Sequence, residues 1–228
     1  MRTSSIHQIL FVRHAQTTYS NIYPDITEEG TEQLRQTAKG LHPFIFNGTY
    51  PNLKIIASPA VRAQGSARVL VEALQHAGEI ITEPLLRDMH VYNWPRAKEL
   101  FNQCLLNGGR VEDVYDFDDC FEDENIFESR SVIQERFFCY MGQLQAALAQ
   151  STEPQCIVAV SHFEVLNHFL RSLWPDAPWL RWASSFRITM EHPTAQHDER
   201  TIVSYGERSI QIDLHLLMKK PSLFALLS

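Results

Sequence analysis

Three short apolar runs constrain the fold of this chain more than any other feature. They are Gln8 to Val12 (QILFV), Leu53 to Ala57 (LKIIA) and Cys156 to Val160 (CIVAV). All three are rich in β-branched residues, and none alternates with polar residues, a pattern typical of parallel strands covered on both faces. We therefore predict three buried strands of a mostly parallel sheet.

Helical patterns lie between and after these runs. The first helix has Thr27 as N-cap with acidic residues in its first turn, and the second has Ser58 as N-cap with Pro59 at the first helical position. A third pattern runs from His162 to Trp174. Strands that alternate with helices predict an α/β fold, a three-layer α/β/α sandwich with a mostly parallel central sheet.

The length of 228 residues suits one sizeable core, so we predict a single domain over residues 1–228. The segment from Trp94 to Arg130 (about 94–130) lacks clean periodicity and holds the acidic run VEDVYDFDDCFEDE. We predict that it is a mainly non-strand cap insertion, although such a charge run is also typical of a solvated face. The C-terminal stretch TIVSYGERSIQIDLHLL predicts an edge hairpin that turns at Gly206.

Composition excludes several classes of function. The formal net charge of -7 argues against binding nucleic acid or an anionic membrane through bulk charge. No apolar stretch is long enough to span a membrane, and no secretory signal is visible. The cysteines Cys104, Cys120, Cys139 and Cys156 lack CxxC spacing, which predicts reduced thiols in a cytoplasmic protein rather than disulfides or a zinc site.

Each apolar run ends in polar residues. Arg13 and His14 follow the first run, Ser58 follows the second with Arg62 in the next helical turn, and His162 closely follows the third. The ends of parallel strands meet at one edge of a sheet, where open α/β folds bind ligands. One such residue alone is as often a plain core or surface group. Two arginines, two histidines and a helix N-terminus together predict an anion site, because guanidinium groups match phosphate oxygens.

The segment RHAQT, Arg13 to Thr17, resembles the RHGxT signature of the histidine phosphatase superfamily, also called the phosphoglycerate mutase-like family. Five further segments resemble family motifs in the same order: ITEEGTEQL, SPAVRAQGSA, LLRDMHVYNW, FESRSVIQER (with Glu128 and Arg136) and VAVSHFEV. Each motif alone is a weak signal, but six in order over most of the chain make a specific resemblance.

This resemblance implies a role for each residue at the strand ends. His14 would attack phosphorus and carry a phosphohistidine intermediate, while Arg13, Arg62 and His162 hold the phosphoryl oxygens. Asp88, in the LRD segment, would protonate the leaving oxygen and then activate water. No metal or other cofactor is implied, and the sequence shows no metal-ligand spacing.

The same resemblance adds Thr17, Ser20 and Asn21 to the substrate-binding residues. Ser20 stands where the family pattern RHGxTxxN has asparagine, and Asn21 follows one place later. Ala15 replaces the glycine of RHG, and Glu164 replaces one of the small residues that end the last motif.

We predict a metal-independent phosphatase that acts on a phosphorylated small molecule in the cytoplasm, with no oligomeric state assigned. The alternative is a phosphate-binding or regulatory module with little turnover, which Ala15 and Glu164 favour. A phosphoglycerate mutase is less favoured, because the chain lacks both an ERHYG stretch and an arginine-rich substrate loop.

Overall fold

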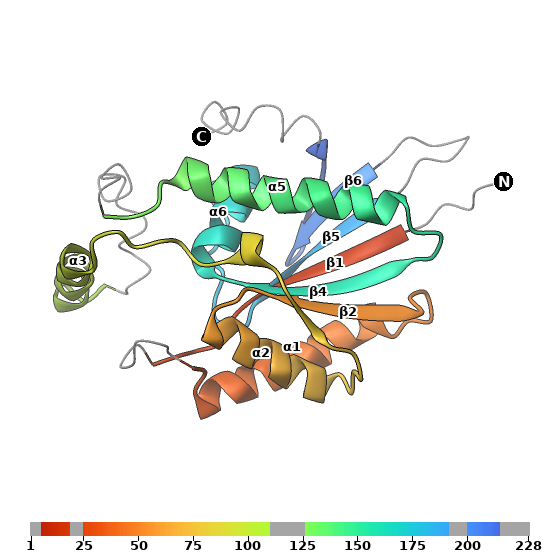
Figure 1. Ribbon diagram of the computed structural model, residues 1–228, viewed down its shortest axis with the longest axis horizontal. Helices are drawn as coiled ribbons and strands as arrows, with labels where there is room; N and C mark the ends of the chain where they lie inside the picture. Colours follow the sequence, from red (N-terminus) through yellow and green to blue (C-terminus); the bar gives the residue numbers. More distant parts are fainter. Residues whose placement is uncertain (1–5, 19–24, 110–125, 192–199, 215–228) are drawn as a thin grey trace.

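The computed structural model describes residues 6–18, 25–109, 126–191 and 200–214, and shows a sheet with helices on both faces (Figure 1). The strands are β1 (Ile6–Arg13), β2 (Asn52–Ala57), β3 (Ile80–Thr82), β4 (Gln155–Ser161), β5 (Ser185–Glu191), β6 (Arg200–Tyr205) and β7 (Arg208–Ile212). The helices are α1 (Glu28–Ile45), α2 (Val61–Ala73), α3 (Trp94–Leu106), α5 (Arg130–Ala149) and α6 (Phe163–Leu173), with a 3-10 turn η1 (Pro84–Leu86).

The sheet has the strand order β3-β2-β4-β1-β5-β6-β7. Its first four strands are mutually parallel, and the other three continue it in antiparallel pairing. The predicted α/β class is confirmed, with the parallel strands in the core of the sheet. The edge hairpin is confirmed as well, because β6 and β7 pair across a turn at Gly206, whose φ of +59° glycine adopts without strain.

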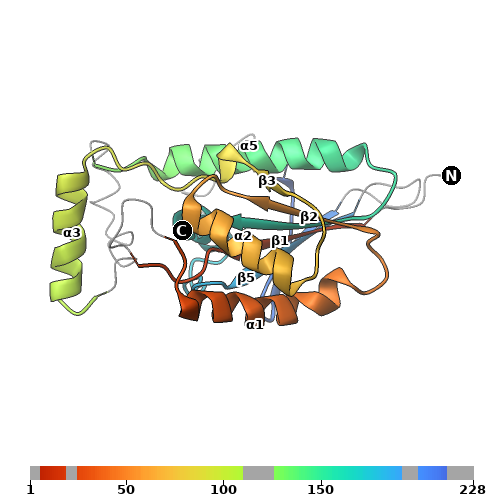
Figure 2. The same cartoon turned by 60° about the horizontal axis from the view of Figure 1, so that its bottom comes forward.

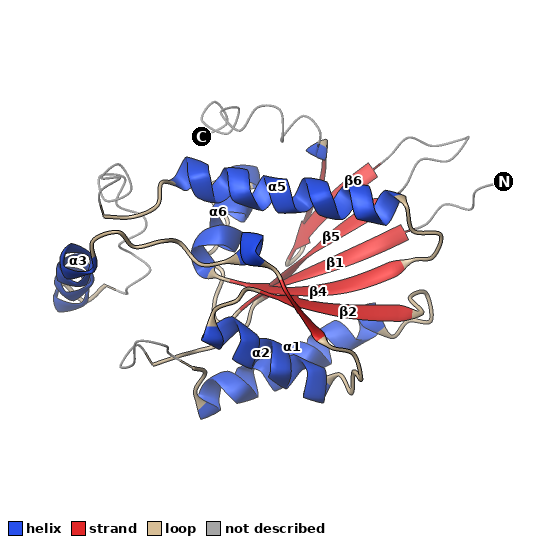
Figure 3. Ribbon diagram, in the orientation of Figure 1, coloured by secondary structure: helices blue, strands red, loops and turns tan. Residues whose placement is uncertain are grey.

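Helices cover the two faces of the sheet in separate layers (Figures 1 and 3). Strand β1 shows how one strand serves both layers: Leu10 and Val12 pack in the hydrophobic cluster of α1 and α2, and Ile9 and Phe11 pack in the cluster of α5 and α6. Every residue of β4 is buried, as is every residue of β1 after Ile6. Burial on both faces is the physical reason for the uninterrupted apolar runs.

Three elements were missed from the sequence. Strand β5 alternates buried Phe186, Ile188 and Met190 with partly exposed residues, a period-two signal that was available but not used. Strand β3 has only three residues, too few to form a pattern. Helix α5 buries one face, where Ile133, Phe137, Met141, Leu144 and Leu148 recur at helical spacing, but apolar residues on its exposed face, such as Val132 and Ala146, obscure that stripe in the sequence.

The predicted start of α1 is confirmed, because the side chain of the N-cap Thr27 accepts a hydrogen bond from the Gly30 N–H. The predicted start of α2 is wrong. This helix begins at Val61, and its N-cap Ala60 offers no side-chain cap. The Ser58 hydroxyl accepts a hydrogen bond from the Ala60 N–H at 3.3 Å, before the helix begins, and contacts Nε2 of His162 at 2.7 Å.

Helix α3 forms within the predicted cap insertion. Its N-cap Asn93 accepts a hydrogen bond from the Arg96 N–H, and Pro95 stands in its first turn, where a missing N–H costs nothing. The helix lies away from the sheet, beyond the edge where β1 and β4 end (Figures 1 and 2). The acidic run lies in residues 110–125, outside the described residues, and the single-domain organisation stays a prediction.

None of the helices in the described ranges is long and apolar enough to cross a membrane.

Candidate active site

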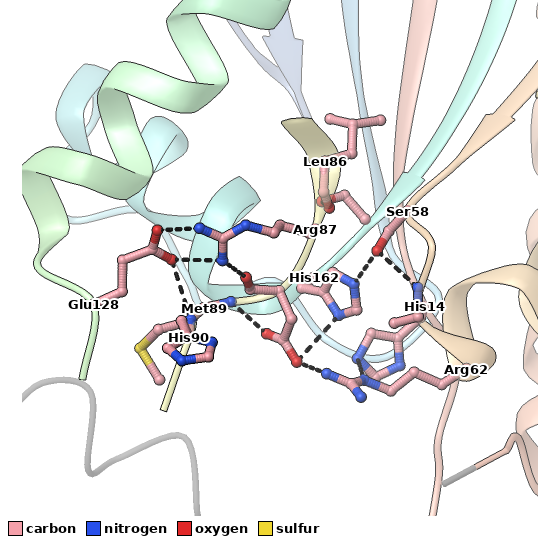
Figure 4. A network of polar contacts seen from close by, with 12 residues as sticks. His14, Ser58, Arg62, Leu86, Arg87, Met89, His90, Glu128 and His162 are labelled. Carbon is pink, nitrogen blue, oxygen red and sulfur yellow. Dashed lines mark hydrogen bonds and ion pairs between the residues drawn. The ribbon is translucent and has the colours of Figure 1, made fainter. Parts of the chain in front are cut away.

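The register of the parallel strands brings the two histidines together. Arg13, at the end of β1, pairs with Ser161 at the end of β4, so His14 and His162 follow side by side. The ring centroids of these histidines are 5.1 Å apart, and the side chains are 2% and 0% exposed. Arg62, from the first turn of α2, points toward both rings (Figure 4). The structure therefore gathers, at one sheet edge, residues that lie up to about 150 positions apart.

The hydrogen bonds of His14 define its tautomer. Its Nδ1 lies 2.9 Å from the carbonyl oxygen of Ala15, and a carbonyl can only accept, so Nδ1 carries the proton. The other ring nitrogen, Nε2, accepts a hydrogen bond from the Nε–H of Arg62 at 3.2 Å. Burial, Arg62 and Arg13 hold the pKa of His14 well below its usual value. A neutral ring with a lone pair on Nε2 is the nucleophilic form of histidine.

His162 offers a hydrogen-bonding group toward the same point. Its Nε2 contacts the Ser58 hydroxyl at 2.7 Å, while its buried Nδ1 makes no hydrogen bond to any residue in the described ranges. Burial is the largest cause of a pKa well below the usual value, and the charge of Arg62 is the next. An anion oxygen beside Nδ1 would give this nitrogen a hydrogen-bond partner. A buried polar atom without such a partner destabilises the folded state.

Asp88 closes the site from a different element. It follows η1, and its side chain is 32% exposed. One carboxylate oxygen pairs with Arg62 and lies 3.7 Å from Nδ1 of His162, while the other accepts from the Met89 N–H at 2.8 Å. Arg62 thus binds the Asp88 carboxylate, and its positive charge would also attract a second anion to the same place.

Arg13 is held beside the histidines by contacts that the sequence did not reveal. Its guanidinium donates to the carbonyl of Leu180 at 2.7 Å and lies 3.7 Å from the ring centroid of Trp182. The Trp182 ring also lies 5.1 Å from that of His14. Trp182 is in the loop before β5, in no motif, so no sequence signal marked it. Its indole orients the arginine and shields His14 from water.

Two departures from the family motifs are accommodated locally. Ala15 is fully buried, and the described non-glycine residues with positive φ are Gln75 and Ala183, so its Cβ causes no backbone strain. Its N–H donates to the Ser66 hydroxyl at 3.0 Å. Glu164 is buried in the first turn of α6, where the helix dipole stabilises a carboxylate.

The remaining predicted substrate contacts stay predictions. The Thr17 hydroxyl donates to the carbonyl of Asp25 at 2.7 Å, so its hydrogen is used within its own loop and only its lone pairs remain available. Ser20 and Asn21 lie outside the described residues.

The buried histidines predict a loss of stability in mild acid. Burial holds the pKa of His14 and His162 well below 6.5, and burial with nearby Arg130 and Arg171 lowers that of His168 to about 3. Below pH ~6.5 the unfolded chain therefore binds protons that the folded chain does not, so stability falls as pH falls, by up to about 1.4 kcal/mol per pH unit for each histidine. Urea unfolding without phosphate, from about pH 7.5 to about pH 5.5, measures this slope.

A control separates these residues from other titrating groups. In the His14→Asn variant the free energy of unfolding should fall less steeply with falling pH, by the contribution of one histidine, and the variant should still be folded at the start of the titration. A free energy of unfolding that stays level across this pH range would contradict the prediction.

The structure is an α/β protein with two buried histidines and two arginines at one sheet edge, an arrangement suited to an anion, and comparison with known families gives this class a name. The chain belongs to the histidine phosphatase superfamily (branch 1), whose family model matches residues 9–206. No curated protein matches the chain.

Solved structures share the fold at low identity. Phosphoglycerate mutase from Bacillus anthracis has a TM-score of 0.61 at 13% identity, covering 82% of this chain and 88% of its own. A mycobacterial glucosyl-3-phosphoglycerate phosphatase in complex with inorganic phosphate has a TM-score of 0.57 at 18% identity, with 89% and 97% covered. The protein histidine phosphatase SixA, complexed with tungstate, has a TM-score of 0.50 at 12% identity, with 92% and 99% covered.

Proposed function

We propose that this protein is a phosphatase that hydrolyses phosphomonoesters of small molecules through a phosphohistidine on His14, without a metal ion. The observation that carries the proposal is the orientation of His14: the lone pair of Nε2 faces Arg62, which also pairs with Asp88, and the His14 and His162 ring centroids are 5.1 Å apart. Membership of the histidine phosphatase superfamily supports the same reaction class.

In the first half-reaction the phosphoryl group binds where Arg62 now holds Asp88. Its oxygens bind Arg62, Arg13 and Nδ1 of His162, which stabilise charge in a loose transition state. A carboxylate that has lost its cation and lies beside a phosphate favours its protonated form, so Asp88 becomes a proton donor. As Arg62 turns to the phosphoryl oxygens, its hydrogen bond to Nε2 of His14 breaks and the freed lone pair attacks phosphorus. The bond to the ester oxygen breaks, and that oxygen takes the proton of Asp88.

In the second half-reaction the Asp88 carboxylate acts as a base. It takes a proton from a water molecule as the water oxygen attacks phosphorus, and the phosphorus–nitrogen bond breaks. Inorganic phosphate leaves, and His14 returns to its neutral state. Ala15 and Glu164 favoured the binding-module alternative, but Ala15 fits without strain, so we favour the enzyme.

Metal independence is part of the proposal, because the arginine side chains supply the positive charge that a metal ion supplies in other phosphoryl-transfer sites. We also propose a cytoplasmic location, on the spacing of the cysteines.

Hydrolysis of phosphate esters in the presence of EDTA tests the proposed function. We expect release of inorganic phosphate from an aryl phosphate and from at least one member of a panel of sugar and alkyl phosphates. Rapid quenching should trap a phosphoryl group on His14, identified by mass spectrometry of base-stable peptides. If no ester is hydrolysed and no ester leaves a phosphoryl group on the protein, the proposed function is wrong.

A further inference from the structure

The loop that carries Asp88 is attached to a partly buried ionic group outside the proposed catalytic set. This group, the Glu128 triad, consists of Arg87, Glu128 and Arg136 (Figure 4 shows the first two). The side chain of Glu128 is 2% exposed, and both of its carboxylate oxygens accept hydrogen bonds from the arginines. Although burial raises the pKa of Glu128, the hydrogen bonds of Arg87 and of the His90 N–H, with the charge of Arg136, lower it overall.

Arg136 binds the backbone on either side of Asp88. Its guanidinium donates to the carbonyl of Arg87 at 2.6 Å, to that of Leu85 at 3.1 Å and to that of Asp88 at 3.4 Å. These acceptors are the carbonyl of Asp88 itself and those of two residues that precede it. A planar guanidinium with several donors can therefore fix the direction of this backbone as well as its position.

Glu128 binds the chain just after Asp88. Its carboxylate accepts from the His90 N–H at 3.1 Å, and its own N–H donates to the His90 carbonyl at 2.8 Å. Val91 and Phe127 continue this pairing as an antiparallel bridge. The loop bearing Asp88 is thus held from both ends by residues at the start of α5 and in its second turn.

Stability alone is a weak explanation for this arrangement. A buried ion pair gains little net free energy over apolar packing, because the charges must be removed from water. The triad has two arginines and one carboxylate, so it carries a net positive charge. The charge of Arg136 is among the causes of the lowered pKa of His162. The triad acts on the position of Asp88 and on the potential at the anion site.

We propose that Glu128 is a positioning residue which, through Arg87 and Arg136, holds the backbone of residues 85–90 so that the Asp88 carboxylate reaches the leaving oxygen of the substrate. This inference rests on the proposed function, because it assigns Glu128 to the proton-transfer step of that reaction. A misplacement of about 1 Å in a catalytic group lowers the rate ~10²-fold.

The test compares two substrates on the Glu128→Gln variant, which keeps the size of the side chain and loses its charge. An alkyl phosphate needs a proton on its leaving oxygen, whereas p-nitrophenyl phosphate needs little help. We expect kcat/KM, which reports the first half-reaction and not the hydrolysis of phosphohistidine that both esters share, to fall about 10–100-fold for the alkyl ester and less than about threefold for the aryl ester. A defect in folding alone would slow both substrates equally, and thermal unfolding monitors the fold directly.

A double-mutant cycle with Asp88→Asn supplies the decisive comparison. If Glu128 acts through Asp88, Glu128→Gln should change alkyl-phosphate turnover less than about threefold in the Asp88→Asn background. If Glu128→Gln fails to fold, Arg87→Lys is a milder second variant, because the Arg87 side chain is 39% exposed. It should also slow the alkyl ester more than the aryl ester. Asp176→Asn removes another arginine–carboxylate pair, that with Arg208, and should leave both rates unchanged.

The outcomes separate this inference from the proposed function. Equal slowing of both esters, or additive effects in the cycle, would overturn the role of Glu128 while leaving the phosphatase intact. An unmutated protein that turns over neither ester would overturn both.

Discussion

Replacing His14 with alanine is expected to lower kcat for aryl and alkyl phosphates by a factor on the order of 10⁴–10⁶, because the proposed covalent intermediate forms on this side chain. The effect should be the same for both esters, since both require the same attack on phosphorus. Steady-state kinetics in EDTA measures the loss, and mass spectrometry of the quenched protein should show no bound phosphoryl group.

The fold should survive this substitution. The backbone N–H of His14 donates to Ser161 at 2.9 Å, and its carbonyl accepts from Ala183 at 3.3 Å, and neither bond involves the side chain. His42→Ala is the control, because His42 is exposed in the last turn of α1. This variant should keep full activity and should still carry the phosphoryl group when quenched. Turnover by His14→Ala within tenfold of the unmutated protein would show that another group attacks phosphorus.

Replacing Asp88 with asparagine is expected to slow an alkyl phosphate by ~10²–10⁴-fold, the usual contribution of a positioned proton donor. Asparagine cannot donate a proton to a leaving alkoxide. A nitrophenolate leaves without that proton, so the aryl ester should lose far less in kcat/KM, which reports the first half-reaction and not the hydrolysis of phosphohistidine that both esters share. Parallel kinetics on the two esters, with one variant preparation, measures the difference and cancels any loss of folded protein.

The ion pair between Asp88 and Arg62 adds a second readout. Asparagine no longer competes with the anion for Arg62, so inorganic phosphate should bind Asp88→Asn more tightly than it binds the unmutated protein. Glu83→Gln is the matched control, because Glu83 lies nearby but caps η1 through the Leu85 N–H, which glutamine can also do. Equal slowing of both esters by Asp88→Asn would remove Asp88 from the acid role.

The amino-acid sequence determined three of the four parallel strands, β1, β2 and β4, and most residues of the candidate site. Strands β1 and β4 were predictable because a strand buried on both faces must be apolar at nearly every position, which leaves a visible run. His14 and His162 were predictable because each directly follows the end of such a strand, and parallel strands end at one edge. These inferences use only local pattern and the rules of sheet topology.

Only the tertiary structure decided which partner each polar group takes. Ser58 has the sequence of a helix cap, yet its hydroxyl binds a histidine 104 residues away. Glu128 and Arg136 matched a motif, but their attachment to the loop of Asp88 depends on how α5 packs beside η1, which no local pattern encodes. Trp182 carries no motif and reaches the site because the loop before β5 folds back over Arg13. Local sequence specifies backbone propensity and burial, whereas side-chain partners are chosen by the packing of elements distant in the chain.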